Sequence, residues 1–456
     1  MPVQHAIKSK IVIGFFFFFL FLQSNAQLLT RTFKKEAVQA DIKVAIDSLK
    51  RYHPGLYRYI SKADFDLFTT QLIASAPDAG DIWDNYSYIA QLTNTVKCGH
   101  TRITPPAEDL QALRQVAVFF PLPTRWLHDS LYVCLPGSNG KDTWFHVSSI
   151  NNMQSKDLLH YLENRFALDG DSREGKQLFF DNLAYYYAAL IDRPSSFVLK
   201  LKPLEKGSDT LASVAPVTWI ALENMRKSQG IILGTGRLFP FSYIQKNGVG
   251  VLTVKNFNSA RHKAFGVNFK EFLDSVFTEI NRASVKHLVI DIRNNGGGDD
   301  ELGALLYSYL TNKPFRYFET VNRLEAGNVI PVQHPQLEWQ RPQPQAYLGR
   351  TSLLVDGLTY STAADFAAIF KEHKRGKVIG METGGAYQGN NSGESVDVIL
   401  PYTKLVLTIP LWQYTNAVAN KKSKNGVLPD IEVMPSKRWL VTKEDEVMQT
   451  ALGLYK

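Results

Sequence analysis

The rear part of the chain, from about residue 241, alternates short apolar runs with amphipathic segments. The run at 286–292 is nearly continuous, which is typical of a strand covered on both faces. The segments 248–257 and 352–355 have the character of further strands, and apolar residues recur at helical spacing over 269–280. Strands and helices that alternate in this way are joined by crossovers. The pattern therefore predicts a largely parallel sheet with helices on its faces.

The stretch LLVDGLTYSTAADFAAIF (353–370) joins one such strand, through a tight Asp-Gly turn, to a helix. One stripe of this helix is apolar and faces a core. Ser361 lies where the loop becomes the helix, beside backbone N–H groups that lack intrahelical partners and favour negative charge. A hydroxyl at this point lies next to donors that can stabilise an oxyanion.

Ser361 also has a purely structural interpretation. Thr362 and Asp365 have the spacing of a capping box, with Ser361 the residue before it. Because helix caps far outnumber nucleophiles, this stretch alone leaves both interpretations open.

A glycine-rich loop, RNNGGGDD (293–300), follows the apolar run at 286–292 and opens another helix. Glycines permit positive φ and bring backbone amides close to a bound group. The dinucleotide-binding and P-loop patterns are both missing. The loop therefore favours an oxyanion hole, in which an amide near Gly297 and the amide of Thr362 hold a carbonyl oxygen.

The front of the chain, about 34–100, predicts helices, with apolar periodicity over 37–49, 65–74 and 82–96. Gly99 ends the last of these, and His100 follows directly. His100 is either a helix-end histidine stabilised by the helix dipole or a functional group.

The middle of the chain, about 106–240, predicts short strands around one helix. Strands are expected at 131–135 and 144–147 around a Gly137–Gly140 turn, and at 196–201 and 210–217 around residues 206–208. Such a module could bind an extended peptide by adding it to a sheet edge, or it could be an ordinary α+β spacer.

Residues 1–26 have the order of a secretory signal, with Lys8 and Lys10 before an apolar stretch and small or polar residues up to Ala26. We expect cleavage after Ala26, a periplasmic or secreted protein, and no integral membrane span after signal removal. The apolar stretch is short for a bilayer, and an uncleaved anchor is the alternative.

Charge and spacing restrict the partners. The net charge of +8 falls to +6 without Lys8 and Lys10, and the basic residues are scattered, so we expect no nucleic-acid partner. Metal-ligand spacings such as C-x-x-C are absent, so no metal and no cofactor are predicted. Cys98 and Cys134 could pair in an oxidising compartment, which the sequence does not decide.

The order of several motifs resembles the tail-specific, or C-terminal processing, serine protease family, over nearly all of the mature chain. The matching stretches are HPGLYRY (53–59), CGHTRI (98–103), HLVIDIRNNGGG (287–298), DGLTYSTAADFAAIF (356–370), KVIGMETGG (377–385) and NGVLPDIEV (425–433). SSINN (148–152) lies where many members carry a PDZ-like module.

This resemblance implies an α/β catalytic core of ClpP/crotonase type at 241–456. A helical N-terminal domain (27–105) and a small, PDZ-like α+β module (106–240) would precede it.

The resemblance also implies a serine nucleophile, and Ser361 occupies its place. The lysine of a Ser–Lys scheme would fall on Ala386, so that scheme is missing. The tricorn-like scheme takes a histidine from the preceding domain, and His100 falls on it as general base. Gly297, Gly298 and Thr362 are the predicted oxyanion-hole residues.

The chain departs from the family around this histidine. Where this chain has Cys98, relatives often have an aspartate, and where it has Gly99, tricorn-like members have a serine. The tricorn-like members also have a glutamate just before the glycine of the G-V-x-P-D motif, where this chain has Ser-Lys-Asn at 423–425. An imidazole base needs its second nitrogen hydrogen-bonded to fix its tautomer. The orienting acid is unknown. The candidates are Glu382, Glu394, Asp430 or a backbone carbonyl.

Three hypotheses follow. The first is an exported serine endopeptidase that hydrolyses peptides or unfolded protein tails through an acyl-enzyme. The second is a catalytically weak or inactive peptide-binding protein of the same fold, and the third a crotonase-like acyl-thioester enzyme, which export disfavours. The sequence does not indicate an oligomeric state.

Overall fold

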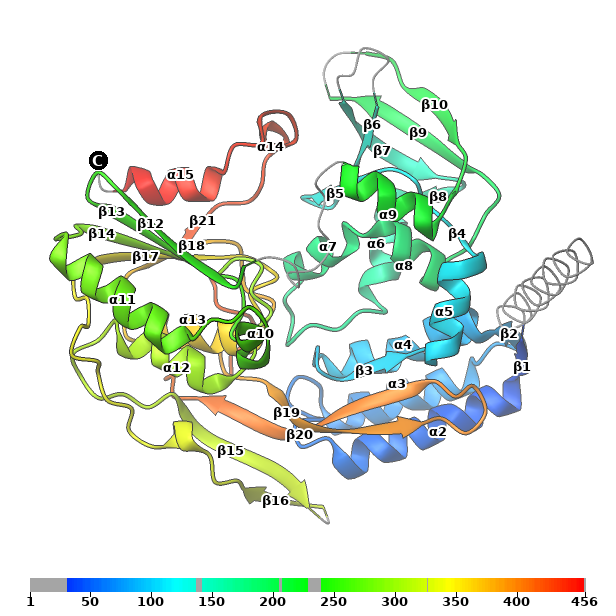
Figure 1. Ribbon diagram of the computed structural model, residues 1–456. Coiled ribbons are helices and arrows are strands. Elements are labelled where there is room, and N and C mark those ends of the chain that lie inside the picture. The colour runs from blue at the N-terminus through cyan, green and yellow to red at the C-terminus, as the bar shows by residue number, and fades with distance from the viewer. Residues whose placement is uncertain (1–30, 137–141, 205–206, 229–238, 326, 455–456) are drawn as a thin grey trace, which may run out of the picture.

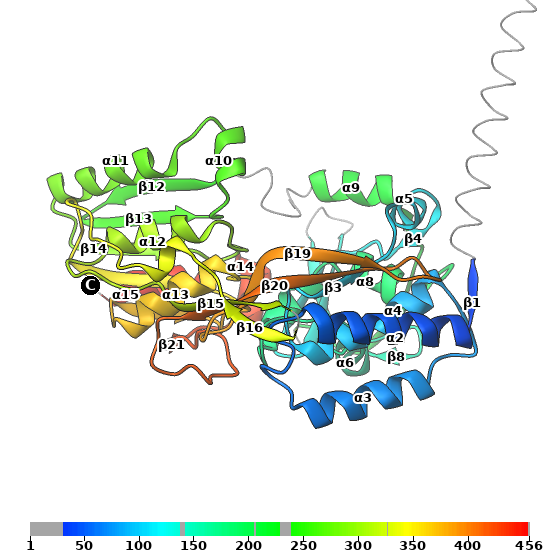
Figure 2. The same cartoon turned by 90° about the horizontal axis from the view of Figure 1, so that it is seen from below.

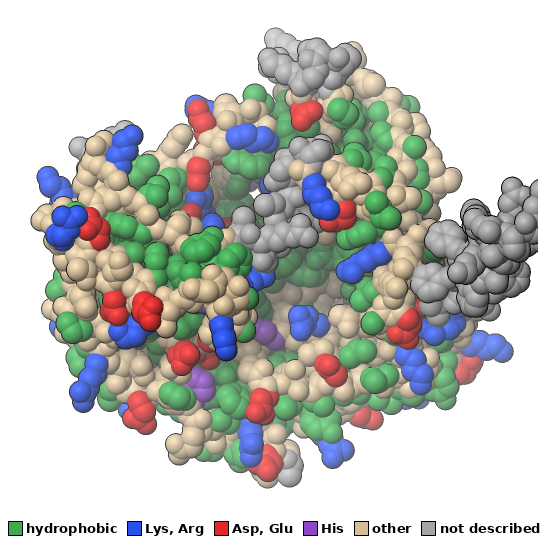
Figure 3. Space-filling model, in the orientation of Figure 1, with side chains coloured by type: hydrophobic (Ala, Val, Ile, Leu, Met, Phe, Trp, Pro, Cys, Tyr) green, Lys and Arg blue, Asp and Glu red, His purple; other side chains and the backbone are tan. Residues whose placement is uncertain are grey.

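The structure is a computed structural model that describes residues 31–136, 142–204, 207–228, 239–325 and 327–454. The predicted signal segment and the predicted turn at 137–140 lie outside the described residues, as does residue 206 of the second turn. Within the described ranges, no helix is both long and apolar enough to cross a bilayer. The molecule has two lobes with a hollow between them (Figures 1 and 3).

The rear lobe is built on a six-stranded sheet. Its strand order is β12 (Phe241–Lys246), β13 (Val249–Val254), β14 (His287–Asp291), β17 (Arg350–Val355), β18 (Lys377–Gly380) and β21 (Ile431–Glu432). Neighbours from β13 to β21 are parallel, and only β12 is antiparallel to its neighbour. The predicted parallel sheet is therefore confirmed.

Helices cover both faces of this sheet (Figure 1). One face packs on α11 (Phe269–Arg282), α12 (Asp300–Ser308) and α13 (Thr362–Glu372), and the other on α15 (Glu446–Gly453). Alternate strand residues divide between these faces: Leu353 belongs to the first core and Leu354 to the second. The short helix α10 (Ser259–Ala264) completes this lobe, whereas α14 (Lys437–Thr442) packs on the other lobe, where Leu440 lies against Leu127 and Tyr132.

The other lobe combines the front helices with the middle module. Its helices are α2 (Lys35–Tyr52), α3 (Lys62–Ala74), α4 (Ile82–Val96), α5 (Ala107–Val116), α6 (Ser155–Glu163), α7 (Glu174–Phe180), α8 (Leu183–Leu190) and α9 (Trp219–Ser228). An antiparallel sheet runs in the order β10 (Thr210–Val214), β9 (Phe197–Pro203), β7 (Thr143–Ile150), β6 (Ser130–Leu135) and β5 (Thr124–Leu127), with β8 (Met153–Gln154) beside β7. Small pairs join β1 (Thr32–Lys34) to β2 (Ala79–Asp81) and β4 (Val118–Phe119) to β11 (Val217–Thr218).

The helices predicted for the front of the chain and the strands predicted at 131–135, 144–147 and 196–201 are confirmed. The middle part, predicted to hold one helix, instead contains α5 to α9, and the segment predicted as one strand at 210–217 divides into β10 and β11. One continuous hydrophobic core runs from Val38 on α2 to Leu222 on α9, so the helical region and the middle module pack as one body.

A second sheet, which the sequence did not predict, connects the lobes. Its order is β16 (Asn328–Pro331), β15 (Phe318–Glu325), β20 (Val406–Asn416) and β19 (Asn391–Ile399), and β3 (Arg102–Thr104) of the other lobe pairs with β20. A single-turn helix, η2 (Pro335–Leu337), follows β16. The β19–β20 hairpin runs from the rear lobe across to α2 (Figures 1 and 2). Leu400 and Leu405 at its far end are fully buried in the core of the other lobe.

Asp41 on α2 holds the tip of this hairpin. Its carboxylate, which is fully buried, accepts hydrogen bonds from the N–H of Tyr402 (2.9 Å), the N–H of Thr403 (2.8 Å) and the Thr403 hydroxyl (2.6 Å). Because β20 also pairs with β3, this contact fixes the strand that directly follows His100.

We expect Asp41→Ala to lower the free energy of unfolding by about 2–4 kcal/mol, because it leaves buried donors at Thr403 without an acceptor. Urea denaturation of the full chain measures the change. Asp47→Ala, on an exposed position of the same helix, is the matched control and should stay within about 0.5 kcal/mol of the parent. Equal stability of both variants would show that the hairpin tip does not depend on Asp41.

Candidate active site

Ser361 lies at the junction between β17 and α13 in a strained backbone conformation, with φ 54° and ψ −133°. Such a positive φ is uncommon for a residue other than glycine and costs about 1–3 kcal/mol, which functional sites often tolerate. The side chain makes no capping hydrogen bond and is partly exposed. The strained turn therefore leaves the hydroxyl free of a capping role at the start of the helix.

The capping-box interpretation of this segment is wrong. Thr362 Oγ1 lies 2.7 Å from the Gly298 carbonyl and 2.9 Å from Asp300 Oδ1, so it bonds to the glycine loop and to α12. Asp365 is fully buried and accepts a hydrogen bond from Asn390 Nδ2 (2.8 Å). Both side chains serve the packing of α13 against its neighbours.

Gly297 lies directly against the serine. A Cβ added to Gly297 would lie 2.7 Å from Ser361 Cβ and 3.0 Å from the Thr362 nitrogen, and its φ of +95° favours glycine. The N–H of Gly297, however, donates to Asn295 Oδ1 (2.9 Å), so this amide is engaged, contrary to its predicted role as an oxyanion donor. In the described parts of the chain, the N–H groups of Gly298 and Thr362 have no recorded partner.

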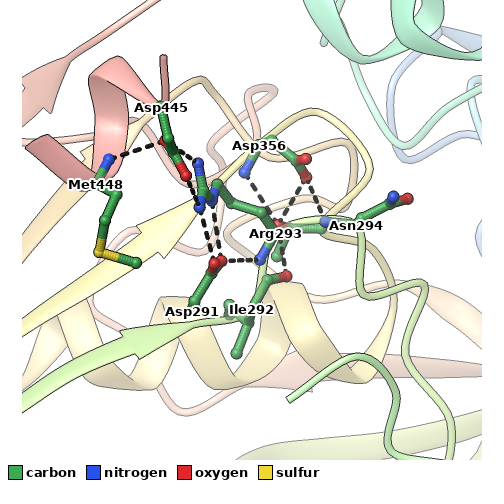
Figure 4. Close-up of polar contacts among 8 residues, drawn as sticks. Asp291, Ile292, Arg293, Asn294, Asp356, Asp445 and Met448 are labelled. Atoms are coloured by element: carbon green, nitrogen blue, oxygen red, sulfur yellow. Dashed lines mark hydrogen bonds and ion pairs between the residues drawn. The ribbon is translucent and has the colours of Figure 1, made fainter. Parts of the chain in front are cut away.

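The glycine loop is held by a network of polar contacts at its start (Figure 4). The Arg293 guanidinium is bidentate to Asp445, the N-cap of α15, and also bonds to Asp291 at the end of β14. The N–H of Asn294 donates to Oδ1 of Asp356 (2.9 Å), the residue directly after β17. These contacts join the ends of neighbouring parallel strands, which is where sites form in such sheets.

His100 comes from the other lobe and reaches this junction. Its Nδ1 lies 3.1 Å from the hydroxyl oxygen of Tyr360, the residue before Ser361, and the two ring centroids are 4.9 Å apart. His100 follows α4 and precedes β3, so the pairing of β3 with β20 carries it to the rear lobe. The structure thus brings His100, Ser361, Gly297, Gly298 and Thr362 to one place.

Burial governs the electrostatics of this region. It lowers the pKa of His100 to about 4, with a smaller contribution from Arg102. The imidazole is therefore neutral at pH 7, the form in which it can accept a proton.

The sequence analysis missed two residues of this site. Tyr360 contacts His100, and Asp169 contacts Tyr360. Tyr360 donates its hydroxyl to Asp169 Oδ1 (2.9 Å), which also accepts the N–H of Gly99 (3.1 Å). Burial raises the pKa of Asp169 to about 6. Tyr360 lies beside Ser361 in the sequence, but neither residue carries a sequence signal of its own.

The orienting acids suggested from the sequence have other positions. Glu382 accepts the N–H of Gly426 (2.7 Å), and Asp430 bonds to Lys371 Nζ (2.6 Å) and to the N–H of Val378 (2.9 Å). Glu394 is exposed on β19. The ring of His100 instead contacts the hydroxyl of Tyr360.

Cys98, His100 and Asp169 are the one group whose donor atoms could approach a metal ion, within the described residues, since these atoms lie within 4.8 Å of one another. The same side chains already have partners: Cys98 Sγ lies 3.6 Å from the Asn391 carbonyl, and the other two bond to Tyr360. Cys98 and Cys134 are buried and are not joined.

A mixed α/β fold with a serine at a strained strand-to-helix turn, beside a glycine loop and one residue after the tyrosine that contacts a neutral imidazole, is compatible with a serine peptidase. Residues 248–433 match the model of peptidase family S41. The predicted relation to the C-terminal processing proteases is confirmed at this level.

Curated relatives support the same assignment. The chain is 24% identical over 257 residues to a protein described as "Probable CtpA-like serine protease" from Staphylococcus epidermidis, which covers 55% of this chain and 45% of the relative. A second strain of the same organism gives the same values. The chain thus spans about half the length of the curated relatives it matches.

Solved structures show a similar fold over most of the chain. Mature CPAF matches with a TM-score of 0.62 at 13% identity, covering 92% of this chain and 95% of the other. Mature CPAF complexed with lactacystin matches with a TM-score of 0.64, also at 13% identity, covering 92% and 97%. At this identity the likeness concerns the fold alone.

Proposed function

We propose that the chain is an exported serine endopeptidase that cleaves peptides or unfolded protein tails through an acyl-enzyme. The observation that carries this proposal is the contact of His100, from one lobe, with the residue preceding Ser361 in the other. In this proposal Ser361 is the nucleophile and His100 the general base. The match to peptidase family S41 supports the reaction class.

The proposed reaction begins when Ser361 Oγ attacks the scissile carbonyl carbon while His100 Nε2 takes its proton. The amides of Gly298 and Thr362 stabilise the oxyanion, and the strained turn at Ser361 holds the hydroxyl beside them. The C–N bond then breaks, and His100 returns the proton to the leaving amine. Water, activated by His100, hydrolyses the ester and frees Ser361.

The finer structural assignments belong to the same proposal. We assign the rear lobe to the ClpP/crotonase type and the middle module to a PDZ-like class that receives extended peptides at a sheet edge. The domain limits at 27–105, 106–240 and 241–456 remain as predicted from the sequence, as do the signal segment and the periplasmic or secreted location.

A fluorophosphonate probe tests the nucleophile. We expect one covalent adduct, mapped by peptide mass spectrometry to Ser361, because the probe reacts with serines activated by a base. Ser361→Ala should lose the adduct, whereas Ser392→Ala, a serine of β19 in the same lobe, should keep it. Labelling that persists in Ser361→Ala would remove the proposed nucleophile.

A specific observation favours a second candidate function, a peptide-binding protein of the same fold with little or no turnover. The chain has Ala386 at the place of the family's lysine and no acid at 423–425. This candidate predicts no adduct at Ser361 and peptide binding that Ser361→Ala leaves unchanged.

A further inference from the structure

We propose that Asp169 and Tyr360 are a positioning pair that holds His100 in its Nδ1–H tautomer, so that the middle module supplies the acid missing from 423–425. The inference rests on the proposed function, in which His100 is the general base and needs a free lone pair on Nε2. Neither residue touches the reacting atoms. Both act through His100.

Donor and acceptor inventories fix the direction of each hydrogen bond. A carboxylate only accepts, so the phenol O–H of Tyr360 is the donor in its 2.9 Å contact with Asp169 Oδ1. The phenol has no second hydrogen. It must therefore accept in its 3.1 Å contact with His100 Nδ1, which places the imidazole hydrogen on Nδ1 and leaves Nε2 with its lone pair.

The protonation states fit this direction. Burial, and then the nearby Asp169 charge, raise the pKa of Tyr360 well above its ordinary value, so the phenol keeps its hydrogen. The pKa of Asp169, raised to about 6 by burial, leaves it a carboxylate at pH 7, helped by the N–H of Gly99 and the charge of Arg58. The contacts of Asp169 with the Tyr360 hydroxyl and the Gly99 N–H are both made through Oδ1.

The backbone around Asp169 is fixed from both lobes. The N–H of Asp169 donates to the Gly384 carbonyl (3.3 Å), that of Gly170 to the Lys97 carbonyl (3.0 Å), and that of Asp171 to the Lys424 carbonyl (2.8 Å). This loop of the middle module therefore lies between the His100 loop and the segment that carries the acid in relatives.

Gly99 explains how the phenol can lie so close to the histidine loop. A Cβ at Gly99 would be 2.4 Å from the Tyr360 hydroxyl oxygen. The serine that tricorn-like relatives have at this place would exclude the phenol. The exchange of serine for glycine and the loss of the family acid therefore fit one rearrangement, in which Tyr360 and Asp169 take over.

The first test measures the tautomer itself and needs no turnover. Long-range ¹H–¹⁵N correlation spectra of ¹⁵N-histidine-labelled protein at pH 7.5, with His100→Gln to assign the resonance, should show His100 with its hydrogen on Nδ1. Neutral imidazole in water prefers the Nε2–H form. We therefore expect Tyr360→Phe and Asp169→Asn to shift His100 toward Nε2–H, while Asp171→Asn, an exposed neighbour in the same loop, leaves it unchanged.

The second test is kinetic. Tyr360→Phe should lower kcat for a fluorogenic peptide by about 100-fold, because a misdirected base is worth a loss of that order, while KM stays within about threefold. Asp169→Asn should behave alike, and the double variant should be no worse than either single one.

The outcomes separate this proposal from the proposed function. A wild-type spectrum with the hydrogen on Nε2, or a tautomer that both variants leave unchanged, overturns the positioning pair, even if a variant folds poorly, since the wild-type spectrum stands alone. An Nδ1–H tautomer that depends on Tyr360, in a protein that forms no adduct at Ser361, supports the pair and removes the peptidase proposal.

Discussion

Alanine at His100 is expected to lower kcat/KM for peptide hydrolysis by about 10⁴- to 10⁶-fold, the range found when a member of a serine triad is removed. A serine hydroxyl is a weak nucleophile, and His100 is the imidazole that contacts the residue beside Ser361. A continuous assay with a quenched fluorescent peptide measures the change. KM should move little, because the imidazole acts in the transition state.

The double variant of Ser361 and His100 gives a sharper test than either single variant. If Ser361 and His100 act as one unit, the double variant Ser361→Ala/His100→Ala should be no slower than either single variant. His160→Ala is the matched control, because this histidine is exposed on α6, and its kcat/KM should equal that of the parent. Losses that multiply, or a His100→Ala variant within tenfold of the parent, would mean that the base lies elsewhere.

The rear lobe could be predicted because its signals are local. The run at 286–292 is apolar on both faces, and β14 is indeed buried at every position. The same holds for Ser361, since a strand, a turn and a helix adjacent in sequence define its place. The cap and nucleophile interpretations differ only in where the hydroxyl points, and the backbone angles that decide this are not readable from residue types.

The sheet that joins the lobes could not be predicted for the opposite reason. β3 pairs with β20 about 300 positions later in the chain, and β19 is half-exposed with no strong apolar alternation. The role of Asp41 could not be predicted for the same reason. A single acid on a helix is normally solvated, and only the approach of the hairpin tip makes it a buried acceptor.

The position of His100 was predicted from a family resemblance, but its environment was not. The acids proposed for it were chosen near the family motif, whereas Asp169 comes from a loop of the middle module that long-range packing brings in. A tyrosine beside a candidate nucleophile carries no sequence signal of its own, because its contacts with His100 and Asp169 form only when the lobes pack together. The sequence shows only that Gly99 replaces the serine of tricorn-like relatives. The structure adds the steric reason, because a Cβ at Gly99 would collide with the Tyr360 hydroxyl.

Alanine at Gly297 is expected to lower kcat/KM by about 10²- to 10³-fold, comparable to the loss of an oxyanion-hole donor. The added methyl would lie 2.7 Å from Ser361 Cβ and 2.8 Å from the Tyr360 carbonyl, so the serine or the loop must shift. The φ of +95° adds strain of about 1–3 kcal/mol, which thermal denaturation should report as lower stability.

Gly296→Ala is the matched control for this prediction. It adds the same methyl one residue earlier, where no atom lies within 4 Å and φ is not in the left-handed range. Its kcat/KM and stability should therefore stay close to those of the parent, with a change in unfolding free energy within about 0.5 kcal/mol. Because the two variants differ only in which glycine is filled, equal activities would show that close contact between the loop and Ser361 is not needed for the reaction. A loss confined to Gly297→Ala would instead locate the requirement at the serine itself.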